Sequence, residues 1–249
     1  MALTKVGKEG ITGISNSSNA NAITIDSSEK VLIGNTSDGD TTGLSVNKAG
    51  GGNFIAHFRN TTVGTPYGVK ISAPSGDTSG YPLLYIGDHA SEEYFKVQNN
   101  GIVTMPLQPA FSVTANQQND IPINGATTLE FANEIFDQNA DFNTGTYTFT
   151  APVTGKYMLN VNLRMDNVDR DHVYLYMILK TSNREYEWLQ DISVLYGDDP
   201  DYLPFTINVL ADMDASDTAY VRMHIPNLGA AISDVVGSSI STFSGYLAC

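Results

Sequence analysis

Few residues of this chain could carry out catalysis or hold a metal. The four histidines lie far apart in the sequence: His57, His89, His172 and His224. They form no His-Glu-x-x-His zinc pattern, and the sequence contains no Gly-x-Ser-x-Gly nucleophile motif. The single cysteine, Cys249, is the last residue, and the pair Glu92-Glu93 has no context for acid–base work. We therefore expect a protein that is not an enzyme.

Carboxylates gather in three short stretches that could be considered as cation sites. These are Asp166, Asp169 and Asp171; Asp198, Asp199 and Asp201; and Asp212, Asp214 and Asp217. Calcium needs six to eight oxygen ligands from a flexible loop, and none of the stretches has EF-hand spacing. We interpret them as solvated turns and expect no metal or cofactor, with calcium as the alternative.

The charge balance excludes two classes of partner. The chain carries 13 basic and 27 acidic residues, a formal net charge of -14. Binding to nucleic acid or to an anionic membrane relies on clustered Lys and Arg, so neither is expected. No apolar run approaches the roughly 18 residues of a membrane span, and the first residues lack the apolar core of a secretory signal. Synthesis inside a cell and release by assembly and lysis fits these features, and it is typical of phage virion proteins.

The front of the chain consists of strand candidates three to five residues long, among them 54–58 and 67–71, and Gly, Asn, Asp, Ser or Pro separates most of them. Residues 1–35 hold strand candidates at 23–25 and 31–33 and are expected to act as a thin N-terminal anchor. Residues 36–106 continue the pattern, with Asn99-Asn100-Gly101 as a hairpin signal. Strands this short rarely make an independent sandwich. We expect 36–106 to be a β shaft in which several chains wind together.

The rear of the chain, residues 107–249, has longer strands with clear alternation. In 155–166, Tyr157, Leu159 and Val161 fall on one face and Met158 and Asn160 on the other, which predicts a half-buried strand. The run 173–179 is apolar throughout and is expected to be covered on both sides. Residues 129–136 would also fit a helical stripe, but we read them as strand because their neighbours are strands.

Separated motifs in this rear half resemble the C1q-like family. They are "PAFSV" at 109–113, "LEFANEIFDQNADFNTGTYTFTAPVTGKYMLNVNL" at 129–163 and "STFSGYLAC" at 241–249. The residues that match the family's aromatic strands, its Pro-x-x-Gly-x-Tyr turn and its last strand are Phe111, Tyr147, Phe149, Pro152, Gly155, Tyr157, Phe243, Gly245, Tyr246 and Leu247. The stretch 167–204 matches by strand pattern alone.

The resemblance implies an all-β, ten-stranded jelly-roll sandwich of the C1q/TNF type that assembles as a homotrimer. It implies that the first and last strands of the domain lie together, and it permits calcium near the apex of the trimer. The matched residues, except Leu247, are our candidates for the fold and trimer core. The preceding "PLLYIGDHASEEYFKVQNNGIVTMP" resembles segments of phage tail-fibre proteins.

The aromatic residues of "NREYEWLQDISVLYG" have two interpretations. Tyr186, Trp188 and Tyr196 could face a receptor protein or glycan, or they could lie in the core or the trimer seam. The function predicted from the whole sequence is a trimeric phage fibre or spike, located on the virion. Its N-terminus would bind other virion proteins and its head would attach to a host surface. The alternative is a capsid or tail decoration protein that stabilises the particle without binding a receptor.

Overall fold

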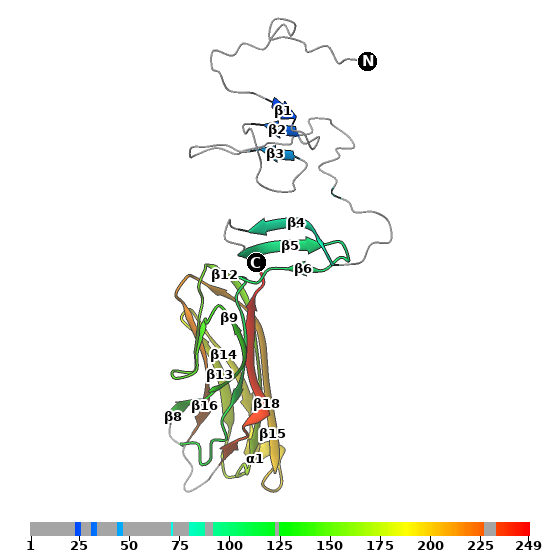
Figure 1. The fold of residues 1–249 in the computed structure, drawn as a ribbon. Coiled ribbons are helices and arrows are strands. Elements are labelled where there is room, and N and C mark those ends of the chain that lie inside the picture. The colour runs from blue at the N-terminus through cyan, green and yellow to red at the C-terminus, as the bar shows by residue number, and fades with distance from the viewer. Residues whose placement is uncertain are drawn as a thin grey trace, which may run out of the picture. The chain divides into compact units, whose positions relative to one another are not determined.

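A computed structural model describes residues 71, 80–87, 92–122, 125–226 and 233–249, together with three strands nearer the N-terminus. The chain divides into two compact units, Met1–Lys70 and Ile71–Cys249 (Figure 1). Each unit is described below by itself.

Three strands of three residues each are described in the first unit. β1 (Ile23–Ile25) pairs antiparallel with β2 (Val31–Ile33), and β2 pairs parallel with β3 (Leu44–Val46). The strand predictions at 23–25 and 31–33 are therefore confirmed. The strand candidates predicted at 54–58 and 67–71 lie outside the described residues, except for residue 71, which is not in a strand.

The second unit begins with a small antiparallel sheet in the order β4-β5-β6. Its strands are β4 (Pro82–Gly87), β5 (Glu93–Gln98) and β6 (Val103–Thr104). The predicted hairpin turn joins β5 to β6, and its Gly101 has a φ of +86°. An L-residue with a side chain rarely adopts that conformation, which explains a glycine at this position.

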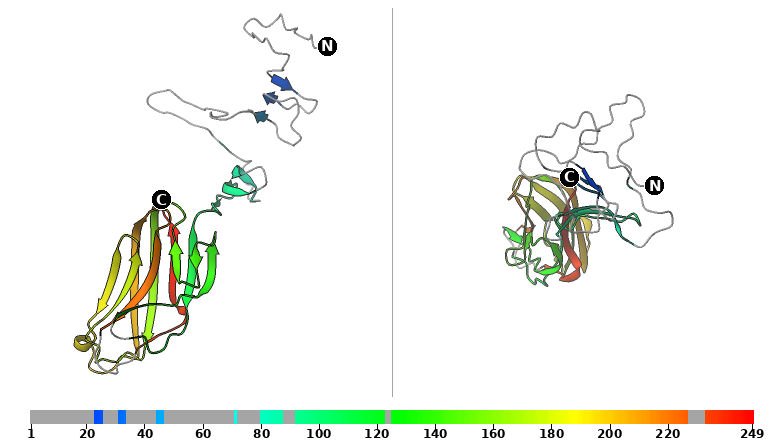
Figure 2. Two further views of the ribbon diagram at one scale, coloured as in Figure 1. Left: turned by 90° about the vertical axis from the view of Figure 1, so that its left-hand side faces the viewer. Right: turned by 45° about the horizontal axis from the view of Figure 1, so that its top comes forward.

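Two larger antiparallel sheets then form the rear domain. One has the order β15-β12-β18-β7-β9 with β17 paired to β12, and the other the order β10-β11-β16-β13-β14 with β8 paired to β16. With β17 and β8 each sheet has six described strands, so the domain has twelve described strands where the resemblance implies ten. The left view of Figure 2 shows these strands running along the length of the domain.

The first sheet consists of β7 (Ala110–Ala115), β9 (Asn133–Gln138), β12 (Gly155–Asp166), β15 (Tyr202–Met213), β17 (Asp234–Val235) and β18 (Ser238–Leu247). The second consists of β8 (Gly125–Thr128), β10 (Phe142–Asn143), β11 (Thr148–Thr150), β13 (Leu175–Thr181), β14 (Glu185–Gln190) and β16 (Thr218–Ile225).

Strict alternation along the long strands places the core between the two sheets. Tyr157, Leu159 and Val161 of β12 are fully buried, and Phe205 of β15 and Val221 of β16 face the same interior. The first strand, β7, pairs antiparallel with the last, β18, as the resemblance implies. The strand interpretation of 129–136 is confirmed for 133–136, which lie in β9, and is wrong for 129–132, which precede that strand without regular structure.

Two local expectations need correction. Residues 173–179 are not covered on both sides, because Val173 is 43% exposed and Tyr174 and Tyr176 are half-buried. The tyrosine rings instead stack on one another on the outside of the sheet, with ring centroids 6.0 Å apart. A short helix, α1 (Ile192–Leu195), follows β14 where no helix was predicted. A single turn carries too little periodicity to be detected in a sequence.

Candidate subunit interface and the open side of the sandwich

Four aromatic residues of the family-like motifs, Phe111, Phe149, Tyr157 and Phe243, form one cluster in the interior. The Phe111 ring stacks on Phe149 with centroids 4.7 Å apart and on Phe142 at 5.1 Å, and it meets Phe243 edge-on at 5.0 Å. Tyr157 lies against Phe149 at 5.4 Å. The cluster joins β7, β10, β11, β12 and β18, so these residues connect both sheets and specify the fold.

Two motif glycines are explained by close approach. A Cβ on Gly245 would lie 2.6 Å from Leu159 Cδ2 and 2.8 Å from Phe111 Cε1. A Cβ on Gly155 would lie 2.5 Å from Leu247 Cδ1 and 2.8 Å from the Cys249 carbonyl oxygen. All four distances are too short for a Cβ atom, so neither glycine can carry a side chain without a shift of its neighbours. The Pro-x-x-Gly-x-Tyr turn and the last strand therefore depend on each other.

The remaining motif residues lie at turns or on the surface. The Tyr157 hydroxyl donates a hydrogen bond of 2.8 Å to the Val153 carbonyl and closes the turn that contains the exposed Pro152. Burial raises the pKa of the Tyr157 phenol. Tyr147 is only partly buried and has a φ of +59°. Tyr246 is 50% exposed on the outer face of β18.

The outer face of the β15-β12-β18-β7-β9 sheet is uncharged over three cross-strand rows, and we call these rows the uncharged face. Fifteen side chains form it, five in each row. The first row is Leu210, Met158, Tyr246, Ala110 and Gln138; the second is Asn208, Asn160, Ser244, Ser112 and Phe136; the third is Thr206, Asn162, Thr242, Thr114 and Asn133.

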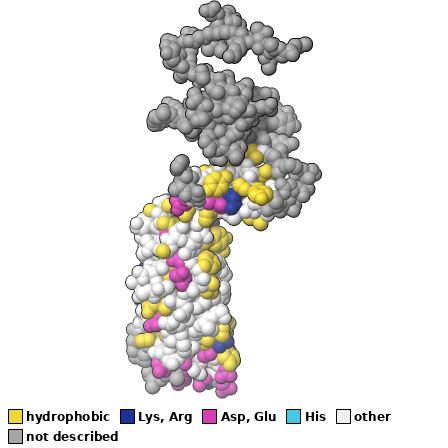
Figure 3. Space-filling model, viewed as in Figure 1, with side chains coloured by type: hydrophobic (Ala, Val, Ile, Leu, Met, Phe, Trp, Pro, Cys, Tyr) yellow, Lys and Arg dark blue, Asp and Glu magenta, His cyan; other side chains and the backbone are white. Residues whose placement is uncertain are grey.

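Large apolar side chains stand exposed on this uncharged face. Leu210 is 58% exposed, and Tyr246 and Phe136 are 50% exposed. Figure 3 shows hydrophobic side chains along the right-hand margin of the domain, in the region of β15 and β18. Five of the fifteen side chains are apolar and the other ten are uncharged polar groups. On a chain of net charge -14, an uncharged face that exposes these large apolar side chains is our candidate interaction surface. Sequence reasoning missed this face. The signal was present in the outward positions of β12 and β15, which alternate with the core residues and carry no charge over these rows.

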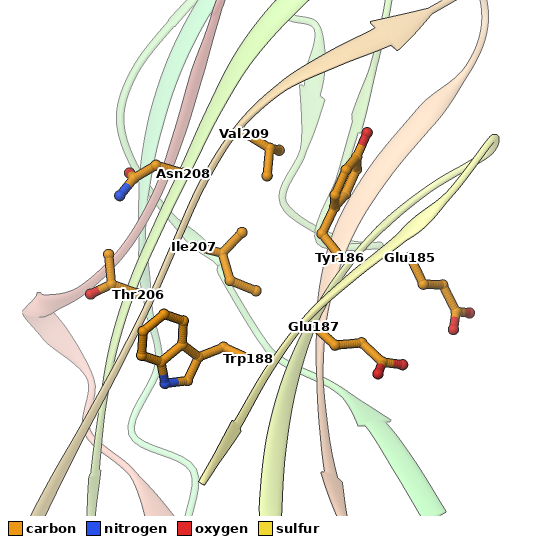
Figure 4. Close-up of a pocket in the computed structure, with 8 residues that line it drawn as sticks. All are labelled: Glu185, Tyr186, Glu187, Trp188, Thr206, Ile207, Asn208 and Val209. Carbon is orange, nitrogen blue, oxygen red and sulfur yellow. The ribbon is translucent and has the colours of Figure 1, made fainter.

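The open side of the sandwich lies where the edge strands β14 and β15 face each other. Its lining includes Tyr186 and Trp188 from β14 and Ile207 and Val209 from β15, around a groove of about 650 Å³. In Figure 4 the Trp188 indole and the Ile207 side chain point into this groove, whereas the Glu187 side chain points away. Trp188 is 48% exposed, although its strand is paired with the core strand β13.

The structure brings together two of the three predicted receptor-facing aromatics. Tyr186 and Trp188 share the groove, whereas Tyr196 follows α1 and packs against the core without lining it. Which partner these side chains contact stays a prediction.

The acidic stretches contact hydrogen-bond donors of the chain itself. Asp199 accepts from the Arg170 backbone N–H at 3.0 Å, and Asp217 accepts from the Asn183 side-chain amide at 2.8 Å. Within 92–122, 125–226 and the other described segments, no group of three or more His, Cys, Asp or Glu side chains is placed to hold a metal ion. Among the same residues, no helix has the length and apolar character needed to cross a membrane.

Two of the four histidines, His172 and His224, lie among the described residues. His172 is buried, and its Nε2 lies 3.1 Å from the Ser233 hydroxyl. The His224 ring stacks on Tyr176 with centroids 4.4 Å apart. Both are held by neighbouring side chains of the fold. His57 and His89 lie outside the described residues.

Comparisons with known proteins give similar solved structures and one family match. Among solved structures, the globular domain of zebrafish complement 1qA matches with 19% identity and a TM-score of 0.42, over 57% of this chain and 98% of that one. Murine APRIL matches with 10% identity and a TM-score of 0.42, over 56% and 98%. No curated protein sequence matches. The C1q domain profile matches residues 110–248, more than half of the chain. The chain therefore belongs to the C1q domain family.

Proposed function

We propose that this protein is a homotrimeric, non-enzymatic structural protein of a phage virion, a fibre or spike whose C1q-type head attaches to a host surface. The observation that carries the trimer is the uncharged face of the β15-β12-β18-β7-β9 sheet. C1q-type domains typically form homotrimers, and the exposure of Leu210, Phe136 and Tyr246 is what a subunit-facing sheet would have before assembly.

The head offers two adjoining surfaces that can meet between copies, and they share Thr206 and Asn208 of β15. The uncharged face is broad, and the groove between β14 and β15 carries the half-exposed Trp188. A contact between two different surfaces of the same subunit is heterologous, and it closes only when the rotation completes a ring. We propose that the groove side of one head packs against the uncharged face of the next, with three copies closing the ring. Tyr186 and Trp188 then lie at the seam.

The assembly is tested on the intact chain by size-exclusion chromatography with light scattering. We expect three times the chain mass for the parent. Leu210→Arg should shift the protein to monomer, because it places one guanidinium group in each of the three subunit contacts, in the row that also holds Met158 and Tyr246. The control is Leu189→Arg on the outside of the other sheet, because Leu189 is 57% exposed and Leu210 58%. A monomeric parent would contradict the trimer, and equal dissociation in both variants would contradict the uncharged face as its interface.

Host attachment is supported by three-fold display and by the family of the head. Three identical heads raise the overall affinity through effective concentration, even when each site is weak. We expect labelled trimers to adsorb to host cells and the Leu210→Arg monomer to lose at least about tenfold in adsorption. Purified particles tagged after Cys249 would place the protein by electron microscopy. Density at the tail tip favours attachment, and density over the capsid with no adsorption favours a decoration protein.

A further inference from the structure

The small β4-β5-β6 sheet lacks a core of its own. No described residue from 80 to 108 is buried, and Pro109 is the first that is. Three strands need an apolar face packed against something to be stable in water. The partner of this sheet therefore has to be found outside the sheet.

The strand register separates two chemically different faces. Leu84, Val97 and Val103 lie opposite one another in one row, and Ile86 faces Phe95 in the next. We call these five residues the stem face. Ile86 is 50% exposed and Val103 is 52% exposed.

The other face of the sheet carries polar side chains that hydrogen-bond to one another. Lys96 donates a hydrogen bond of 2.6 Å to Glu93, and the Thr104 hydroxyl donates to the same carboxylate. Tyr85 stands opposite Lys96 in the register. The charged groups therefore lie away from the stem face. This is the arrangement of an antiparallel sheet with one solvated face and one face packed against another layer.

The segment that leads from β6 into the head is held by side-chain amides. The Gln138 amide donates to the Met105 carbonyl at 3.1 Å and to the Gln108 carbonyl at 2.7 Å, and the Asn139 amide donates to the Leu107 carbonyl at 3.0 Å. The Gln108 amide in turn donates to the Leu247 carbonyl at 2.6 Å. The segment from Met105 to Pro109 is therefore held against the head by hydrogen bonds.

This connection leads directly to the uncharged face of the head. Ala110, the first residue of β7, lies in the first row of that face. Six residue steps separate it from Thr104, a reach of at most about 20 Å. If three heads associate through this face, each brings its own β4-β5-β6 sheet to a boundary between subunits.

We propose that three copies of the β4-β5-β6 sheet bury their stem faces against one another and form the dry core of a three-chain stem. The proposal rests on the trimer proposed above. The stem face is uncharged and therefore self-complementary, and the heads hold the copies at a high effective concentration. Residues 1–70 of the same chain and a different virion protein are the competing occupants.

The first test is disulfide cross-linking of the full chain in a Cys249→Ser background. Ile86→Cys places a thiol on the stem face, and Tyr85→Cys places one on the opposite face at a similar exposure, 45% against 50%. On mild oxidation we expect at least fivefold more disulfide-linked dimer from Ile86→Cys. Three thiols meet in each stem and two of them pair, so up to two-thirds of the chains can run as dimer.

The outcomes separate this proposal from the trimer itself. A parent that is monomeric by light scattering overturns both. A trimeric parent in which Ile86→Cys cross-links no better than Tyr85→Cys overturns the stem alone, as does cross-linking of Ile86→Cys to a different protein in purified particles.

A second measurement reports on burial without a thiol. In an isolated chain Val103→Asp should be harmless, because the side chain already faces water over about half its surface. In the stem it brings three carboxylates together, and we expect tryptic cleavage after Lys96 to accelerate at least tenfold, with Tyr85→Asp unchanged. Equal cleavage rates in the two variants of the trimer would overturn the proposal.

Discussion

The head and the β4-β5-β6 sheet are both antiparallel β structures with alternating side chains, yet they differ in how the apolar side is covered. In the head, Phe111, Phe149 and Phe243 are each no more than 1% exposed, because a second sheet lies over the first. In the small sheet, Ile86 and Val103 remain about half exposed. The comparison teaches that alternating apolar and polar side chains are enough to form a strand. A stable domain also needs a second layer of secondary structure that buries the apolar face.

The largest expected change in stability comes from removing an aromatic ring in the head, and removing one in the small sheet is the matched control. We expect Phe243→Ala to lower the free energy of unfolding of the head by about 3–5 kcal/mol, because its ring contacts Phe111, Phe131 and Phe142. Phe95→Ala, in the small sheet, should leave the unfolding of the head unchanged. Trp188 is the single tryptophan and lies in the head, so urea unfolding followed by its fluorescence reports on the head alone. Both variants must be compared at one protein concentration. Equal losses would mean that the two regions share one core.

A smaller effect should come from adding one methyl group where the head is tightly packed. Gly245→Ala forces a Cβ against Leu159 and Phe111, and we expect a loss of about 1–3 kcal/mol from overpacking. Gly125→Ala is the control, because nothing lies within 4 Å of the place that its methyl group would take. It should change stability by less than about 0.5 kcal/mol. If both glycines tolerate alanine, the close approach of β18 to β7 and β12 does not limit stability.

The smallest effect concerns a polar atom enclosed at the end of the head. The Asp141 Oδ2 is buried without a hydrogen-bond partner. Burial, reinforced by the Asp137 carboxylate, raises the pKa of the Asp141 carboxyl above its ordinary value of 3.8. A raised pKa favours the folded state while the carboxyl is protonated, and that contribution is lost as the pH rises through the folded-state pKa.

Asp141→Asn should therefore stabilise the head at pH 7 by less than about 1 kcal/mol, because the carboxyl is only partly enclosed. The gain should disappear near pH 3, where the native carboxyl is neutral. Thermal unfolding at the two pH values measures the difference, with the exposed Asp171→Asn as control. A gain of the same size at both pH values would contradict the electrostatic explanation.

Local pattern was sufficient for much of the head. The alternation in 155–166 identified the buried face of β12, because a strand side chain can point only to one sheet face or the other. The spaced motifs around Gly155 and Gly245 identified the C1q-like fold, because those glycines occupy positions that no other residue fits. The same reasoning went wrong at Val173–Tyr176, where an apolar run is exposed on one side.

The sequence by itself determined the strands, their inward faces and the family of the rear domain, since these follow from side-chain period and from close-approach glycines. Only the tertiary structure decided which outward faces share a sheet. The uncharged face combines residues of five strands from Ala110 to Tyr246, and the groove joins β14 to β15 across two sheets. Such surfaces arise from strand order and register, which depend on contacts between residues far apart in the chain.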